Sequence, residues 1–152
     1  MRRTLLTTLL LTPLLLTGCI KDSASYFVNA DSNEHTLTVR VEQAYFWDEE
    51  LTLTLFVARM PDCQRRFELA RVPLDEVVVE LFATDANVFT LRAGAQVWQV
   101  ETQTCTQLPT PAAGALGEAI GSYRLDDEDK MVFEKAGGAV VPTAVPAPQP
   151  IE

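Results

Sequence analysis

Apolar and polar residues alternate along the central part of the chain. Over residues 37–47 the odd positions are apolar or aromatic apart from Gln43, and the first even positions are polar. The alternation resumes over residues 51–57, after the acidic triplet at 48–50. A period of two residues places the two sets of side chains on opposite faces of a β-strand. The two segments are therefore predicted to pair as a hairpin.

Four further segments extend this pattern to six predicted strands. Residues 67–72 end at Pro73, and residues 76–83 are rich in valine with apolar residues at both parities, which is typical of a central strand. Residues 88–92 and 96–102 flank Ala93-Gly94-Ala95, where glycine can take a positive φ in a tight turn. These two segments are predicted to form a second hairpin, and residues 123–133 can add a third.

Strands with one apolar face need a cover, which a second sheet can supply. The pattern predicts a mainly β fold, a small antiparallel β-sandwich or barrel-like meander of about six to eight strands. After Cys105, the connector at 109–111 leads into an alanine- and glycine-rich segment at 112–121. We expect at most a short helix there, because its three glycines disfavour helical backbone.

The first residues have the layout of an export signal. Met1-Arg2-Arg3 is followed by a leucine-rich apolar run that extends to Leu16. The alternative is a transmembrane helix, which needs about 20 apolar residues. This run is shorter and is soon followed by Lys21, so the pattern favours an export signal.

The residues after that run resemble the lipobox of bacterial lipoproteins. Leu16-Thr17-Gly18-Cys19 has a branched apolar residue, two small residues and then the cysteine. The resemblance covers this end of the chain and implies cleavage before Cys19 and diacylglyceryl transfer to its sulfur. It also implies an extracytoplasmic domain held at a membrane by two or three acyl chains, enough for lasting attachment. Ile20, rather than aspartate, follows the cysteine, which implies the outer membrane in a Gram-negative cell.

These features divide the chain into four predicted parts. Residues 1–18 form the signal peptide, 19–33 a lipid-anchored linker, 34–136 the β-rich domain and 137–152 a proline-rich flexible tail. Prolines 142, 146, 148 and 150 can hold the tail extended, so it either contacts a neighbour or is solvated.

The charge of the chain bears on its partners. The 152 residues include 12 basic and 21 acidic ones; removing the two arginines of residues 1–18 leaves 10 against 21, a balance of −11. Such an excess opposes binding to phosphate backbones, so we expect no nucleic-acid partner. The expected partners are the membrane, through the lipid on Cys19, and an envelope protein.

With Cys19 assigned to lipid, Cys63 and Cys105 remain as a pair. Export favours a disulfide between them over two free buried thiols. If the six strands run mainly up and down, both cysteines lie at the same end of the sheets, as a disulfide requires. Two cysteines and the distant His35 cannot complete a tetrahedral metal shell, so we expect no metal and no cofactor.

Sequence motifs for catalysis are missing. His35 stands alone in a polar stretch and is expected to be a solvated loop residue, and Ser122 lacks the G-x-S-x-G frame. The sequence also contains neither a phosphate-binding G-x-x-x-x-G-K nor a dinucleotide-binding glycine motif. We therefore predict that the chain is not an enzyme.

Three charged or aromatic clusters remain. The acidic run at 126–129 is expected to be a solvated turn, since it lacks the ligand spacing of a calcium loop. The aromatic residues at 45–47 suit a partner surface or a glycan platform, or packing beneath a second sheet. Four arginines near Cys63 could bind a carboxylate, a phosphate or an acidic partner, or could pair with the chain's own acids. These are Arg59, Arg65, Arg66 and Arg71.

Three functional classes fit these features. The first is a non-enzymatic envelope lipoprotein that binds or scaffolds another component. The second is a subunit of an envelope secretion or assembly complex. The third is a cell-wall or glycan hydrolase that works through two carboxylates, which sequence alone cannot place.

Overall fold

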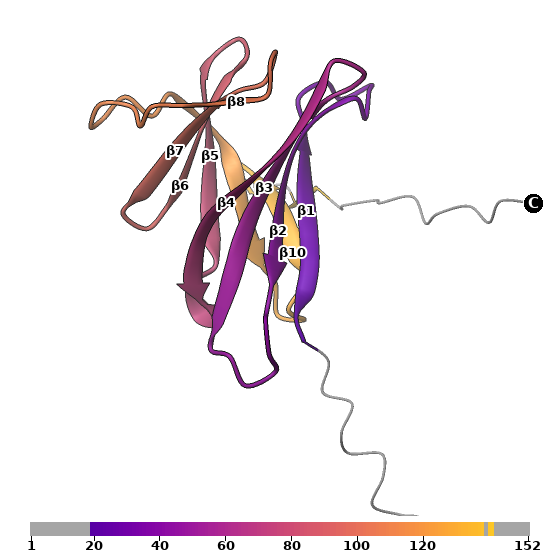
Figure 1. Ribbon diagram of the computed structural model, residues 1–152, viewed down its shortest axis with the longest axis vertical. Helices are drawn as coiled ribbons and strands as arrows, with labels where there is room; N and C mark the ends of the chain where they lie inside the picture. Colours follow the sequence, from indigo (N-terminus) through magenta and orange to yellow (C-terminus); the bar gives the residue numbers. More distant parts are fainter. Residues whose placement is uncertain (1–18, 139, 142–152) are drawn as a thin grey trace, which may run out of the picture.

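The domain is a β-sandwich of two antiparallel sheets, which confirms the predicted fold class (Figure 1). The computed structural model describes residues 19–138 and 140–141. Within them, one sheet has the order β1-β2-β3-β4 and the other β11-β10-β9-β5-β6-β7-β8. The predicted signal peptide (1–18) and most of the predicted tail (142–152) lie outside the described residues.

The first sheet confirms the first predicted hairpin. Its strands are β1 (Lys21–Phe27), β2 (His35–Glu42), β3 (Glu50–Arg59) and β4 (Cys63–Pro73). β2 pairs with β3, and the alternating residues Leu37, Val39 and Val41 are fully buried, as their spacing predicts. β4 starts earlier than predicted. Its first half pairs with β3 through the backbone, but its polar sequence gives no apolar alternation to predict a strand.

The second sheet contains the other predicted hairpins. Its strands are β5 (Val78–Asp85), β6 (Val88–Ala93), β7 (Gln96–Glu101), β8 (Thr106–Leu108), β9 (Glu118–Leu125), β10 (Met131–Lys135) and β11 (Val140–Val141). β5 lies between β9 and β6, a central position as its composition predicts. Gly94 adopts a φ of +57° in the β6–β7 turn, the conformation expected of a glycine there.

The helix expected over residues 112–121 does not form. Residues 112–117 are an irregular connection, and β9 begins at Glu118. Gly117 has a φ of +96°, and a Cβ atom there would lie 2.2 Å from the carbonyl oxygen of Ala83. Thr84 also donates a hydrogen bond from its hydroxyl to the carbonyl of Leu116, 3.1 Å away. Close docking of this backbone onto β5 therefore overrides its weak helical tendency.

The predicted linker at 19–33 is also corrected, because β1 occupies Lys21–Phe27 and pairs along its whole length with β2. Large apolar residues do not alternate with polar ones in this strand, and only Ala24 is fully buried. The Ser25 hydroxyl instead lies 2.7 Å from that of Thr38. Similarly, the predicted tail contributes β11, which pairs with β10 at Phe133 and Glu134.

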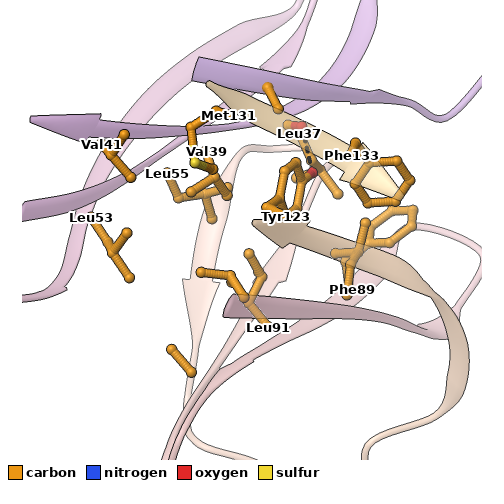
Figure 2. Close-up of a cluster of buried hydrophobic side chains, with 14 of the residues drawn as sticks. Leu37, Val39, Val41, Leu53, Leu55, Phe89, Leu91, Tyr123, Met131 and Phe133 are labelled. Atoms are coloured by element: carbon orange, nitrogen blue, oxygen red, sulfur yellow. Dashed lines mark hydrogen bonds between the residues drawn. The ribbon is translucent and has the colours of Figure 1, made fainter. Parts of the chain in front are cut away.

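The core lies between the two sheets (Figure 2). Tyr123 and Phe133 of the second sheet are fully buried and point toward Leu37 and Val39 of the first. The hydroxyl of Tyr123 donates a 2.7 Å hydrogen bond to the carbonyl of Leu37. Burial raises the pKa of Tyr123 well above its usual value, which keeps the hydroxyl protonated as a donor.

Candidate functional site

Several exposed features gather at the end of the sandwich where the described chain begins. We call it the Cys19 end: residues 19–20, the β2–β3 loop (43–49), the 3₁₀ turn η2 (Leu74–Glu76) and the β9–β10 turn (126–130). In Figure 1 the start of β1 and the β2–β3 loop lie at the bottom of the domain. Cys19 itself is exposed and carries a free thiol.

Gln43 ties the start of the chain to the β2–β3 loop. Its backbone nitrogen donates to the carbonyl of Ile20 at 2.8 Å, and its side-chain oxygen accepts from the Ile20 nitrogen at 3.2 Å. Its side-chain nitrogen donates to the carbonyl of Asp48 at 2.6 Å. Gln43 is buried and fixes both segments in one position. The detectable signal was a polar residue at a core position of an amphipathic strand.

The aromatic residues of the β2–β3 loop point into solvent. β2 ends at Glu42, although the alternation predicts a strand to residue 47. Tyr45, Phe46 and Trp47 are 57%, 59% and 65% exposed, which excludes packing beneath a second sheet. The Tyr45 and Trp47 rings stack with centroids 5.0 Å apart, and Phe46 meets Trp47 edge to face at 4.6 Å. Three exposed aromatic residues therefore form one ordered cluster.

An open groove of about 820 Å³ runs beside this cluster. Phe46 and Trp47 line it from the β2–β3 loop, Leu74 from η2, and Leu125 and Asp126 from the end of β9. It combines apolar surface with several carboxylates, a lining that suits an apolar or cationic group rather than an anion.

The acidic turn at this end satisfies its own backbone. The carboxylate of Asp126 accepts hydrogen bonds from the amides of Glu128 and Lys130, both at 2.9 Å. These two bonds lower the pKa of Asp126. Residues 127–130 are exposed, in line with the expected solvated turn. Within residues 19–138 and 140–141, no group of three or more His, Cys, Asp or Glu side chains is arranged to hold a metal ion.

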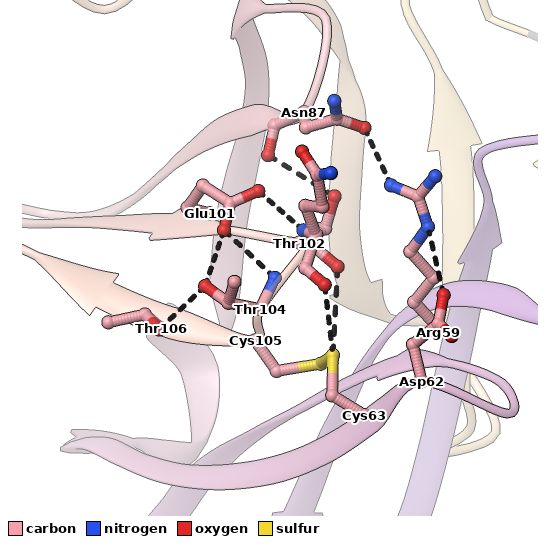
Figure 3. The surroundings of a disulfide bond; sticks show 10 residues. Arg59, Asp62, Cys63, Asn87, Glu101, Thr102, Thr104, Cys105 and Thr106 are labelled. Carbon is pink, nitrogen blue, oxygen red and sulfur yellow. Dashed lines mark hydrogen bonds and ion pairs between the residues drawn. A yellow bond between two sulfur atoms is a disulfide. The ribbon is translucent and has the colours of Figure 1, made fainter.

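The opposite end of the sandwich holds the predicted disulfide, which the structure confirms (Figure 3). Cys63 and Cys105 are bonded with their Cα atoms 5.9 Å apart. The bond joins the start of β4 in the first sheet to the β7–β8 turn of the second. Burial alone would raise the pKa of Glu101, but hydrogen bonds from Thr104 and from the turn's amides outweigh it and lower the pKa. Glu101 thereby stabilises the turn that carries Cys105.

The four arginines predicted near Cys63 do not form one patch. Arg59 donates to the side-chain oxygen of Asn87 at 3.0 Å and lies 4.0 Å from Asp62. Arg71 lies toward the Cys19 end of β4, about 20 Å from Arg65 at the rise of a β-strand. It pairs with two acids at 3.6 Å each, Asp48 and Glu50.

Arg65 and Arg66 are exposed and make no ion pair within the described part of the chain. As neighbours on a strand they point to opposite faces of the sheet. Arg65 is opposite the buried Val57, and Arg66 is opposite Phe56. The guanidinium of Arg40 lies 4.8 Å from the centre of the Phe56 ring. Arg66 therefore belongs to the outer face of the first sheet, whereas Arg65 does not.

The prediction of a solvated loop histidine at position 35 is wrong. His35 is the first residue of β2 and is buried, with its ring centre 6.5 Å from that of Phe89 in the second sheet. Its Nε2 atom has no hydrogen-bond partner among the described residues. Burial, and then the charge of Arg59, lower its pKa. The polar residues that flank His35 gave no sign of its burial, because the residue that covers it, Phe89 of β6, is more than 50 residues away in the sequence.

No protein family model matches this sequence, and searches of characterised proteins and of solved structures give no match either. None of the helical segments in the described part of the chain is both long and apolar enough to cross a membrane.

Proposed function

We propose that this chain is an extracytoplasmic lipoprotein, anchored to the outer membrane through Cys19, whose β-sandwich acts as a non-enzymatic binding or scaffold domain of the cell envelope. The observation that carries the proposal is the position of Cys19. It follows the lipobox-like Leu16-Thr17-Gly18, its thiol is free and exposed, and a single residue separates it from β1. A lipid there would extend from the edge of the domain without disturbing the core.

The other two cysteines support the same compartment. The Cys63–Cys105 bond joins the two sheets, and disulfides of this structural kind persist in exported proteins rather than in a reducing cytosol. The split use of the three cysteines, one exposed and two bonded, agrees with lipid on the first and oxidation of the others.

The surroundings of the polar side chains favour binding over catalysis. The single imidazole, His35, is buried and does not line the large groove at the Cys19 end. Asp126 in that groove is hydrogen-bonded to its own turn, and Asp48 faces Arg71. These two carboxylates stabilise loops, and the exposed aromatic cluster and Arg66 remain as contact surfaces.

Mass spectrometry of the exported protein tests the anchor. We expect the peptide that starts at Cys19 to carry a diacylglyceryl group, and the protein to sediment with membranes. Cys19→Ala, which removes the acceptor sulfur and no core contact, should abolish the modification. An unmodified Cys19 thiol in exported protein would contradict the proposal.

A further inference from the structure

We propose that the loop containing Tyr45, Phe46 and Trp47 inserts into the interfacial layer of the bilayer that holds Cys19, so that the Cys19 end faces the membrane. This inference rests on the proposed lipid anchor. It adds a second contact with the membrane and a fixed orientation, and it commits to a bilayer rich in zwitterionic headgroups.

The proposed anchor lies close to the aromatic loop. Lys21 pairs with Glu42, so Ile20 lies opposite Gln43, and the antiparallel register brings Cys19 level with Ala44. The aromatic cluster begins at the next residue. From Cys19 to the first paired residue of β1 the chain can extend by about 7 Å. A lipid on Cys19 would therefore hold the loop within reach of the headgroups, because no linker separates anchor and domain.

Hydrogen bonds fix the loop relative to the start of the chain. Gln43 is buried and hydrogen-bonded both to Ile20 and to the carbonyl of Asp48, at the two ends of the loop. The Asp48 amide also donates to the carbonyl of Tyr45 at 2.9 Å. The loop is thus fixed relative to the anchoring residue, and its orientation is not left to a flexible stalk.

The side chains of the aromatic cluster suit a membrane–water interface. Tryptophan and tyrosine are enriched at membrane–water interfaces, where the ring is desolvated and its polar edge stays hydrated. Three neighbouring aromatic side chains that are each more than half exposed form an apolar surface that water solvates poorly. Contact with the bilayer removes this surface from water. The lipid on Cys19 already holds the domain at the membrane, so this contact needs no further loss of translational freedom.

The charge around the loop is negative. Asp48 and Glu49 follow the aromatic residues directly, and the acidic turn at 126–129 lies across the groove. Anionic headgroups would repel these carboxylates over about a Debye length, roughly 8 Å at physiological salt. Phosphatidylethanolamine has no net charge and presents an ammonium group that can pair with them. The surface therefore fits a zwitterionic bilayer.

Tryptophan fluorescence tests the inference, because the chain has two tryptophans and they lie in different places. Trp47 is in the loop, whereas Trp98 is on β7 and packs against the core. Trp98→Phe and Trp47→Phe each leave one reporter. The acylated mature proteins are reconstituted into vesicles of phosphatidylethanolamine and phosphatidylcholine, with or without bromine on the acyl chains. We expect brominated lipid to quench Trp47 about twofold and to leave Trp98 unchanged.

Varying the lipid composition of the vesicles gives a second fluorescence test, on the acylated wild-type protein. Replacing part of the zwitterionic lipid by phosphatidylglycerol should reduce the quenching, and added salt should restore it. The wild-type protein carries both tryptophans, so this reading does not depend on how well either variant folds.

Quenching and acylation are measured separately, so insertion of the loop can fail while the lipid anchor stands. If Cys19 is acylated but brominated lipid quenches Trp47 no more than Trp98, the loop does not reach the bilayer and the inference is overturned while the anchor stands. An occupant of another class, such as a glycan or a peptide bound by the loop, would give this result. If Cys19 carries no acyl chain, both proposals fail together.

Discussion

The two lateral sides of the sandwich are closed in different ways. On one side, β1 of the first sheet lies against β10 of the second, and the sheets meet through packed side chains. On the other side, the turn of the β6–β7 hairpin projects away from β4 (Figure 1), and a covalent bond near one end of β4 joins the sheets.

On the β1 side the contacts are dense and include polar ones. The Tyr26 ring lies 5.2 Å from the Phe133 ring, and the Asp22 carboxylate accepts a 2.9 Å hydrogen bond from the amide of Met131. Tyr123 reaches across the core to the backbone of Leu37. Apolar burial and directed hydrogen bonds there hold the sheets without a crosslink.

On the β4 side the inner surface opens. Arg65 is opposite the buried Val57, yet its side chain is exposed. Trp98 is opposite the buried Leu91 and is only partly buried. Side chains cannot bridge sheets that diverge, so the Cys63–Cys105 bond replaces packing where packing is weakest. A domain of this size buries a limited apolar core, so such a bond contributes a large part of its free energy of unfolding.

Of the changes to either side, breaking the disulfide should reduce the free energy of unfolding most. We expect the double variant Cys63→Ser with Cys105→Ser to lose about 4 kcal/mol of unfolding free energy, because the unfolded chain gains the freedom of an open loop. Urea unfolding monitored by circular dichroism measures the loss. A change below about 1 kcal/mol would mean that packing closes the β4 side after all.

A smaller loss should follow on the packed side. Tyr123→Phe keeps the buried ring and removes the hydroxyl that reaches Leu37, which should cost about 2 kcal/mol because the hydrogen bond is fully buried. The matched control is Tyr45→Phe, which removes an exposed hydroxyl and should leave the urea midpoint unchanged. Equal effects of the two substitutions would show that this hydrogen bond does not contribute to closing the β1 side.

The smallest effect concerns pH and the disulfide end. The pKa of His35 is lowered in the folded domain, so the unfolded chain binds more protons as the pH falls below about 6.5. Stability should therefore decrease from neutral pH toward pH 5, and His35→Leu should flatten this slope. Thermal unfolding of both proteins at several pH values measures the difference. Parallel slopes would assign the pH dependence to other groups.

Much of the fold followed from the sequence where local pattern and burial agree. The buried alternation in β2 and β3 and the glycine turn between β6 and β7 are local signals. The disulfide followed from the pair of cysteines that remains in an exported chain once Cys19 is assigned to lipid, and the parity of the strands agreed with it. β1 could not be predicted, because an edge strand with one small buried residue is held by backbone hydrogen bonds. Its side chains leave no apolar alternation.

The candidate site was less accessible, since its members meet only after folding. The aromatic residues at 45–47 stood out in the sequence, but their exposure depends on where β2 ends. Gln43 gained its role from Ile20, which immediately precedes β1, a strand that the sequence pattern did not predict. The arginines were close in sequence, yet strand alternation separates Arg65 from Arg66, and Arg59 and Arg71 pair with acids of their own.

The crosslink also bears on how the domain responds to force. Cys63 and Cys105 are 42 residues apart in sequence and enclose most of β4, all of β5, β6 and β7 and the turn after β7. Under tension applied to its two ends, the chain can lengthen only outside this ring, which withholds about 150 Å of extension. A domain pulled from its Cys19 end would separate first at β1 and retain the crosslinked part of both sheets.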